Sequence, residues 1–344
     1  MTAAANPRIR VAVVGCGEFG RNHARVYREI ESAELVGVFD TDPSRAAACA
    51  QEFQTQAFSS LEEMRDKADA ASVAVPTLAH AEVGCRLMEL GLDVLVEKPM
   101  AKDLADADAL QGAARERSRI LQVGHVERFN PAVLAVEPIL NRPLFFEAHR
   151  LGVFSPRSLD VDVIYDLMIH DLDILLALVG EPVVELKAVG IPVLSDKVDI
   201  AHARLEFAGG AVANVTASRV STERVRKVRF FQQHEYISLD YARRDALRVR
   251  VKTPAAAPGV QPEFAFEKLP AADREPLRGE LEAFLDAVRT RKAPKTDGAA
   301  GRAALELATR VMASIQEHAV RVQPTAGNPG VDLPVFAYPR KEGS

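Results

Sequence analysis

The feature that most constrains the fold is a glycine-rich turn near the start of the chain, between a strand pattern and a helix pattern. The apolar run Ile9–Val14 leads into Gly15–Gly20, which reads Gly-Cys-Gly-Glu-Phe-Gly, and a helical pattern follows over residues 21–30. A second apolar run, residues 34–39, ends in Asp40, about twenty residues past the last glycine, where dinucleotide-binding units place an acid. This order predicts a βαβ unit of a parallel sheet that binds a dinucleotide.

Each glycine of this turn has a physical purpose in such a site. Gly15 permits the tight turn, Gly17 lets the backbone approach a pyrophosphate, and Gly20 lets the helix pack closely on the strand. The N-terminus of the helix offers free N–H groups and the positive end of its dipole to the phosphates. Glu18 and Phe19, between the glycines, are therefore included among the candidate cofactor-binding residues.

Asp40 is the residue that predicts which dinucleotide binds. Its carboxylate would accept hydrogen bonds from both hydroxyls of the adenosine ribose and would repel a 2′-phosphate, which favours NAD over NADP. Arg45 lies close behind it and is open to two interpretations. It either meets a phosphate or is a solvated charge on the helix that starts near Pro43. The sequence predicts NAD as the cofactor.

Composition and charge narrow the class of protein. The chain has 344 residues, which favours two domains, and its 48% hydrophobic and 26% charged content is ordinary for a globular protein. With 43 basic and 48 acidic residues the net charge is −5, which argues against a nucleic-acid partner. Three cysteines without metal-ligand spacing, no apolar signal region and no long apolar run predict a cytoplasmic protein without a membrane partner.

Strand and helix patterns alternate up to residue 124, which predicts a Rossmann domain over residues 1–124: a doubly wound parallel sheet covered on both faces. The expected strands are 9–14, 34–39, 71–75, 93–96 and 120–124, and the expected helices are 21–30, 43–53, 78–90 and 103–117.

The remaining residues, 125–344, predict a second, α+β domain for substrate binding and oligomerisation, built on a large, mostly antiparallel open sheet. Gly209-Gly210 between two alternating runs indicates a hairpin. One helix is expected around 160–179, and two helices, about 276–291 and 298–318, are expected to close this domain before a C-terminal tail. The expected strands are 144–152, 183–191, 199–207, 211–219, 225–233, 235–240 and 246–252.

Candidate site residues follow the strands of the first domain. Ligands bind beyond the carboxyl ends of parallel strands, and Pro76-Thr77, Glu97-Lys98 and Gly124-His125 all lie at those ends, as Asp40 does. His80, a few residues past Thr77, either lines the cofactor site or only caps and packs a helix. These positions are predicted to converge on one edge of the sheet.

A polar stripe marks the helix expected around 160–179. Asp162, Asp166, His170 and Asp173 recur at helical spacing, so they would share one face of an otherwise apolar helix. His170 suits proton abstraction from a secondary alcohol because the pKa of imidazole is ordinarily near neutrality. Asp166 could hydrogen-bond His170, Lys98 or a substrate hydroxyl. A structural histidine and a divalent-metal site at these residues are the alternatives.

Four blocks in order resemble the Gfo/Idh/MocA oxidoreductase family, over Val11 to about Val320. The resemblance implies that Lys98, at the nicotinamide end of the site, binds the reacting hydroxyl and relays a proton, and that the bond before Pro99 is cis. Low-dielectric walls and the positive ring of oxidised cofactor would favour a neutral lysine there. The resembled family requires no metal. The blocks are Gly15–Gly20, Pro76–His80, Glu97–Ala101 (Glu-Lys-Pro-Met-Ala) and Asp166-x-x-x-His170-x-x-Asp173.

Two runs, Gly124–Pro131 and Tyr165–Asp173, are similar to members of the family that act on UDP-N-acetylglucosamine. Those members oxidise the sugar 3-hydroxyl to a ketone, ahead of an aminotransferase on a route to amide-linked lipid A. Two positions depart from the wider family: Met168 stands where many members have glycine, and His125 where many have a small polar residue. The resemblance therefore implies an NAD-dependent sugar-nucleotide dehydrogenase with His125 among its substrate-binding residues.

Other assignments stay open on the sequence. Arg128 and Arg157 could pair with a diphosphate or form salt bridges between domains. A dehydrogenase of a free sugar or polyol such as inositol is the nearest rival, followed by a non-catalytic cofactor-binding sensor and a structural or assembly protein. Family members pair through an open sheet face, so a homodimer or homotetramer through the second-domain sheet is expected.

Overall fold

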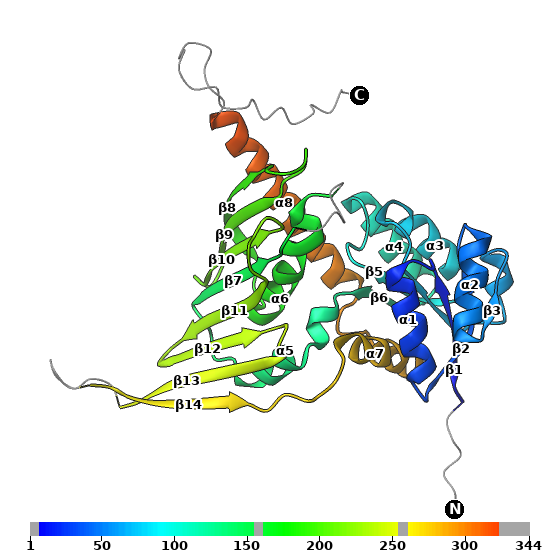
Figure 1. The fold of residues 1–344 in the computed structure, drawn as a ribbon, viewed down its shortest axis with the longest axis horizontal. Coiled ribbons are helices and arrows are strands. Elements are labelled where there is room, and N and C mark those ends of the chain that lie inside the picture. The colour runs from blue at the N-terminus through cyan, green and yellow to red at the C-terminus, as the bar shows by residue number, and fades with distance from the viewer. Residues whose placement is uncertain (1–6, 155–160, 254–260, 323–344) are drawn as a thin grey trace, which may run out of the picture. The chain divides into compact units, whose positions relative to one another are not determined.

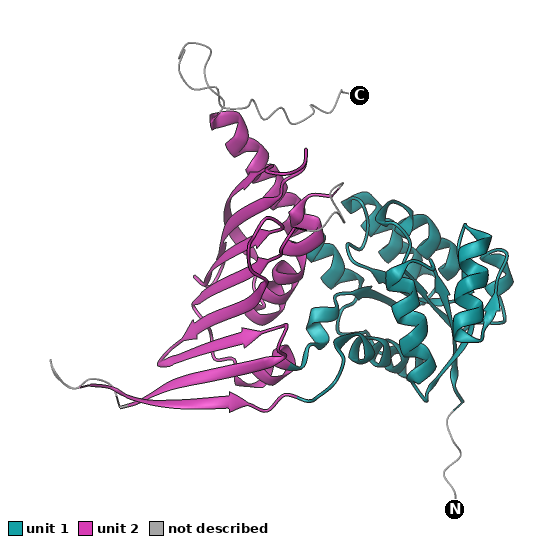
Figure 2. Ribbon diagram, in the orientation of Figure 1, with its two compact units in different colours: residues 1–131, 272–305 teal, residues 132–271, 306–344 magenta. Residues whose placement is uncertain are grey.

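The computed structural model describes residues 7–154, 161–253 and 261–322. The chain forms two compact units (Figures 1 and 2). Unit 1 comprises residues 1–131 and 272–305, and unit 2 comprises residues 132–271 and 306–344. Arg157, a predicted substrate residue, and the predicted C-terminal tail from residue 323 onward lie outside the described residues.

Unit 1 contains the predicted Rossmann sheet, with six parallel strands in the order β3-β2-β1-β4-β5-β6. Val11–Val14 are fully buried, as a parallel strand covered on both faces requires. The strands are β1 Ile9–Val14, β2 Ala33–Phe39, β3 Gln56–Ala57, β4 Ala70–Val73, β5 Asp93–Glu97 and β6 Leu121–Gly124. The helices are α1 Glu18–Glu29, α2 Pro43–Phe53, α3 His80–Glu89 and α4 Leu104–Glu116, with short 3₁₀ turns at Glu62–Met64, Thr77–Ala79 and Val126–Phe129.

Helix α7, Pro276–Thr290, belongs to unit 1, although we expected it to close the second domain. Leu281 and Phe284 are buried in one apolar cluster with Val26 and Tyr27 of α1. The spacing of its apolar residues shows that α7 buries one face, but this pattern does not identify the partner. Helix α8, Gly298–Val322, begins in unit 1 and continues into unit 2.

Unit 2 contains an eight-stranded sheet in the order β14-β13-β12-β11-β7-β10-β9-β8. All neighbouring strands are antiparallel except β7 and β10, which confirms the mostly antiparallel open sheet. The Gly209-Gly210 hairpin joins β9 to β10, and Gly210 has a φ of +86°. The elements are β7 Phe145–Leu151, β8 Val183–Ile191, β9 Ile200–Phe207, β10 Val212–Ser218, β11 Val225–Gln232, β12 Glu235–Asp240, β13 Asp245–Thr253, β14 Glu263–Leu269, α5 Pro131–Val136, a 3₁₀ turn at Glu137–Ile139, and α6 Ile169–Val179.

The two faces of this sheet differ. Along β7, Phe146, Ala148 and Arg150 are buried, while the alternate residues are only half-buried. On the half-buried face an aromatic row crosses the strands: the ring centroids of Phe145 and Phe231 are 5.7 Å apart, and those of Phe231 and Tyr236 are 5.1 Å apart. One sheet face is therefore packed on helices, and the other carries partly exposed aromatic side chains.

The predicted helix around 160–179 is not one regular helix. Residues Ile164–Met168 form a π-helical turn, and only then does α6 begin at Ile169. Asp166 therefore lies in a wider turn than the expected α-helical spacing assumed. Isolated π-helical turns inserted into α-helices are frequent at functional sites. Among the described residues, no helix is long and apolar enough to cross a membrane.

Candidate active site

The glycine-rich turn has the geometry that the sequence predicts. Gly15 has a φ of +95°, and a Cβ built on it would lie 2.5 Å from the carbonyl oxygen of Ala74. A Cβ on Gly20 would collide with the carbonyl oxygen of Gly15, whereas one on Gly17 meets nothing within 4 Å. The turn is therefore packed tightly at its two ends and open at its centre, where a pyrophosphate needs close approach to the backbone.

The start of α1 lies directly after this open position. Gly17 is the N-cap, with an extended backbone, and within the described residues no side chain caps the helix. The first N–H groups of an α-helix have no partner inside the helix and attract anions. The residues present thus fit a dinucleotide, whose phosphates Gly17 and the first turn of α1 would hold.

Asp40 is joined to this turn. Its Oδ2 accepts a hydrogen bond from the backbone N–H of Cys16 at 2.8 Å, and its Oδ1 accepts one from that of Asp42 at 2.9 Å. The side chain is only 7% exposed. Arg45 lies on the exposed side of α2, where its Nε is 3.3 Å from Asp42 and its Nη1 is 3.9 Å from Asp40. The carboxylate is therefore fixed at the end of β2, beside the glycine-rich turn.

Glu97 ends β5 and Lys98 follows it; the bond between Lys98 and Pro99 is cis, which confirms the expectation from the family resemblance. Glu97 Oε1 lies 3.0 Å from Nε2 of His23, and Oε2 accepts a hydrogen bond from the backbone N–H of Lys98 at 3.2 Å. Burial would raise the pKa of Glu97, but the hydrogen bond with His23 and the charges of His23 and Lys98 lower this pKa below its usual value. An ionised carboxylate thus holds the backbone of Lys98.

His80 connects two loops of the site. Its Nδ1 lies 2.9 Å from the carbonyl oxygen of Pro99, and its Nε2 lies 2.9 Å from that of Val75. The side chain is 1% exposed, and burial lowers the pKa of His80. Of the two interpretations, packing describes its geometry: it ties the loop of Pro76 and Thr77 to the turn after Lys98.

His125 and Arg128 lie at the end of β6. His125 is buried, and Arg128 is half-buried, with its Nη2 donating to the carbonyl oxygen of Lys295 at 3.3 Å. Arg128 thereby connects two segments of unit 1 that are distant in sequence.

In unit 2, Asp166 and His170 are half-buried in the π-helical turn and the first turn of α6. Asp162 precedes them, and its Oδ1 accepts a hydrogen bond from the backbone N–H of Val198 at 2.8 Å. Asp162 therefore holds a loop next to β9, a structural contact that the predicted substrate role did not include.

A buried ion pair fixes the helix that carries His170. Asp171 Oδ2 lies 2.8 Å from Nε of Arg150 and Oδ1 lies 3.1 Å from Nη2, with side chains 0% and 4% exposed. The guanidinium also lies 5.0 Å from the ring centroid of Tyr241. The sequence analysis missed this pair, although an arginine at an inward position of the alternating strand β7 is a signal that could have found it.

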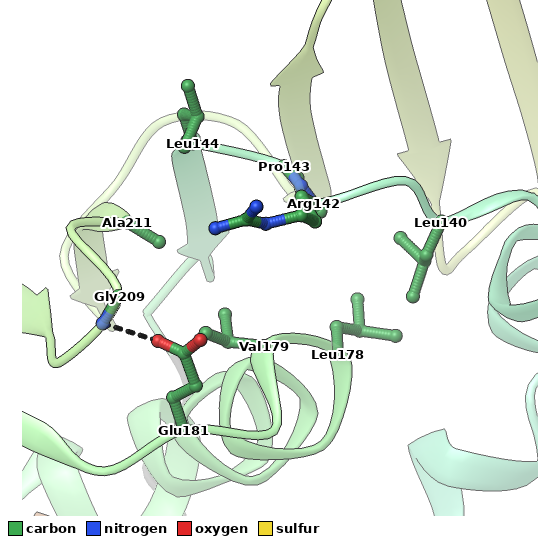
Figure 3. A pocket seen from close by; sticks show the side chains of 9 residues that line it. All are labelled: Leu140, Arg142, Pro143, Leu144, Leu178, Val179, Glu181, Gly209 and Ala211. Carbon is green, nitrogen blue, oxygen red and sulfur yellow. Dashed lines mark hydrogen bonds between the residues drawn. The ribbon is translucent and has the colours of Figure 1, made fainter.

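The cavity drawn in Figure 3 lies elsewhere in unit 2 and has a volume of about 240 Å³. Leu140, Leu178 and Val179 supply apolar walls, and Glu181 accepts a hydrogen bond from the backbone N–H of Gly209. None of the predicted site residues lines it. Its polar contact supports the hairpin rather than chemistry.

Comparison with known proteins places the chain in a family. Residues 9–125 match the family described as "Oxidoreductase family, NAD-binding Rossmann fold", and residues 146–235 match the "GFO/IDH/MocA C-terminal domain". A relative that is 40% identical over 90% of this chain extends the likeness to nearly the whole protein. The chain belongs to the Gfo/Idh/MocA oxidoreductase family. The enzyme class expected from the sequence, a dehydrogenase acting on a CH–OH group, is confirmed by its relatives.

That relative is the UDP-N-acetylglucosamine 3-dehydrogenase of Acidithiobacillus ferrooxidans, 97% of which is covered. A crystal form of the same protein superposes with a TM-score of 0.85, at 39% identity, over 91% of this chain and 99% of that one. The inositol 2-dehydrogenase of Rhizobium meliloti is more distant, 25% identical over 90% of this chain and 97% of its own length.

Proposed function

We propose that this Gfo/Idh/MocA protein is an NAD-dependent dehydrogenase that oxidises a secondary hydroxyl of a sugar nucleotide, UDP-N-acetylglucosamine to its 3-keto form. The observation that carries the proposal is the 40% identity with a UDP-N-acetylglucosamine 3-dehydrogenase over 90% of the chain. Lys98 and His170 are both present in the blocks that resemble the family. A non-catalytic sensor would not need to keep these two groups.

The residues of this chain handle the proton and the orientation of the substrate. In the proposal Lys98 donates a hydrogen bond to the reacting hydroxyl, His170 accepts its proton, and Asp166 orients the imidazole. His125, Arg128, Arg157 and Asp162 remain proposed substrate contacts. When bound, the nicotinamide supplies hydride chemistry, for which the protein provides orientation and electrostatics.

A substrate panel tests this proposal against the nearest rival. Absorbance at 340 nm is followed with NAD and UDP-N-acetylglucosamine, UDP-glucose, free N-acetylglucosamine or myo-inositol, with a ketone trap because such equilibria often favour the alcohol. We expect turnover with the UDP-N-acetyl sugar and a value of kcat/KM at least about tenfold lower for the others, because unpaired polar groups are costly in a built site. Turnover with only the free polyol would refute the sugar-nucleotide assignment.

The finer choice of NAD over NADP is a proposal supported by Asp40. A 2′-phosphate would meet a fixed carboxylate that is 7% exposed, whereas two ribose hydroxyls would find acceptors. We expect Asp40→Ser to lower kcat/KM for NAD by about 10- to 100-fold. The variant loses the proposed bidentate contact with the two ribose hydroxyls and the hydrogen bond that Asp40 accepts from the backbone N–H of Cys16. The same change is expected to raise kcat/KM for NADP by removing the repulsion.

Steady-state kinetics with each cofactor, at saturating sugar nucleotide, measures this change. Glu34→Gln is the matched control, because Glu34 is an exposed acid on the same strand. Its loss should leave kcat/KM unchanged for both NAD and NADP. An unchanged NAD/NADP ratio in Asp40→Ser would contradict the assignment of Asp40.

We also propose that the open face of the unit 2 sheet joins copies of this chain. Phe231 is 36% exposed at the centre of the aromatic row with Phe145 and Tyr236. Because aromatic side chains are enriched in interfaces, we expect Phe231→Glu to convert a dimer or tetramer into a smaller species. Light scattering after size exclusion measures the mass, and Phe264→Glu tests whether β14, at the sheet edge, belongs to the same interface. A native protein that is monomeric at micromolar concentration would contradict the proposal.

We propose that the reaction takes place in the cytoplasm. Cys16, Cys49 and Cys85 are all free in the structure, which suits a reducing compartment. Osmotic fractionation of cells would test this: activity released with periplasmic markers would contradict it.

A further inference from the structure

A buried polar cluster lies behind the Glu97–Lys98 turn. His23 of α1, Glu97 of β5 and Glu280 of α7 each place a side-chain nitrogen or oxygen within 4.8 Å of the others. The residues His23 and Glu280 are 1% and 0% exposed. Among the described residues, these three form the sole group of histidine, cysteine and acidic side chains brought together in this way.

Both carboxylate oxygens of Glu97 have a hydrogen-bonding partner. One oxygen lies 3.0 Å from His23, and the other accepts the backbone N–H of Lys98. A Cβ on Gly124 would lie 3.0 Å from the Glu97 carboxyl carbon, so glycine leaves the space that this side chain fills. A substitution of His23, or of a residue that holds His23, would therefore displace Lys98 through Glu97.

Burial of the Glu280 carboxylate has a cost in folding free energy. Its helix packs through Leu281 and Phe284 on Tyr27 in an apolar cluster, and an apolar residue would serve that packing as well. Buried carboxylates are rare in proteins unless they are paired or hydrogen-bonded. Glu280 lies within 4.8 Å of His23 and Glu97, and Glu97 accepts the backbone N–H of Lys98, so a contribution to the position of Lys98 would offset this cost.

We propose that Glu280 is a positioning residue for the reaction: its carboxylate, within 4.8 Å of the His23 imidazole, holds that ring against Glu97, and Glu97 in turn holds the backbone that carries Lys98. The inference rests on the proposed function, because it assumes that Lys98 acts on the substrate. Glu280 would act through Glu97 without touching substrate or cofactor.

The test compares Glu280→Gln with Glu282→Gln, the same change on the same helix at a side chain that pairs with Arg278. We expect Glu280→Gln to lower kcat by about 10- to 100-fold, since small displacements of a reacting group have effects of this size. The KM for the sugar nucleotide and the Kd of NADH, measured by fluorescence, should stay within about threefold, and Glu282→Gln should match the native protein. An unchanged kcat, or equal changes in kcat and Kd, would overturn the proposal.

A double-mutant cycle separates positioning from general damage. If Glu280 acts through Glu97, the variant carrying both Glu97→Gln and Glu280→Gln loses no more activity than Glu97→Gln alone. Additive losses would overturn the proposal, as would a stoichiometric divalent metal that Glu280→Gln removes, measured by elemental analysis. If Glu280→Gln does not fold, Glu280→Asp, which keeps the charge but withdraws the carboxylate, replaces it in the same cycle.

Lys98→Met in the same assays separates this inference from the function on which it rests. Inactive Lys98→Met with fully active Glu280→Gln would refute only the positioning role. Active Lys98→Met would refute the proposed role of the lysine itself.

Discussion

Replacing Lys98 by Met is expected to lower kcat by about 10²- to 10³-fold, the usual effect of removing a hydrogen-bond donor to the reacting oxygen. Methionine keeps much of the length of the side chain but cannot donate a hydrogen bond to the reacting hydroxyl. Lys98 follows β5 at the carboxyl end of the parallel sheet, and Glu97 holds its backbone N–H. We therefore expect the Lys98→Met variant to fold normally but to lose most of its turnover.

Two measurements check this expectation: NADH formation under saturating substrate, and NADH binding by fluorescence. Lys102→Met is the matched control, because Lys102 is an exposed lysine whose partner is Asp106. We expect NADH binding within about threefold of native in both variants. Native turnover in Lys98→Met would contradict the assignment.

Replacing Arg150 by Met is expected to destabilise the protein by about 3–5 kcal/mol, because it removes the guanidinium that compensates the buried carboxylate of Asp171. This carboxylate is 0% exposed and receives two hydrogen bonds from the guanidinium. Since Asp171 adjoins His170, we expect the loss of activity to accompany the loss of stability.

Urea unfolding followed by circular dichroism measures this change. Arg229→Met is the matched control: Arg229 is an exposed arginine on β11 whose Nη1 lies 3.7 Å from Glu147, and such exposed pairs contribute less than about 1 kcal/mol. The variant carrying both Arg150→Met and Asp171→Leu should regain much of the lost stability, because no uncompensated charge remains buried. A cost below about 1 kcal/mol for Arg150→Met would contradict this account.

Signals within short segments made the first βαβ elements of unit 1 predictable. Strand β1 and helix α2 have the predicted bounds because their signals lie in the segment itself: β-branched residues in Ile9–Val14, and the N-cap Asp42 with Pro43 after it. The hydrogen bond between Asp40 and the glycine-rich turn follows from the same βαβ geometry.

Long-range packing could not be predicted in the same way. The apolar face of α7 is visible in the sequence, but its burial against α1, some 250 residues earlier, is not. Strand β14 was missed, although Phe264 and Phe266 stand at strand spacing, because two such residues are a weak signal beside a Pro/Ala-rich segment. The π-helical turn at Asp166 gives no periodicity that differs clearly from an α-helix.

The same division applies to the site. Residues that belong to motifs, such as Gly15 and Asp40, were found by spacing. Partners that the fold brings together were not: Asp171 pairs with Arg150 across 21 residues of sequence, and Glu280 reaches Glu97 and His23 from the far end of the chain. Only the tertiary structure shows which charges share a buried environment.

The most direct test of the central claim uses UDP-N-acetylglucosamine labelled with deuterium at carbon 3 of the sugar. The account predicts that the deuterium appears in the reduced cofactor, with one labelled NADH for each 3-keto product, measured by mass spectrometry. Unlabelled NADH with this substrate would show that another carbon is oxidised and would contradict the proposed reaction.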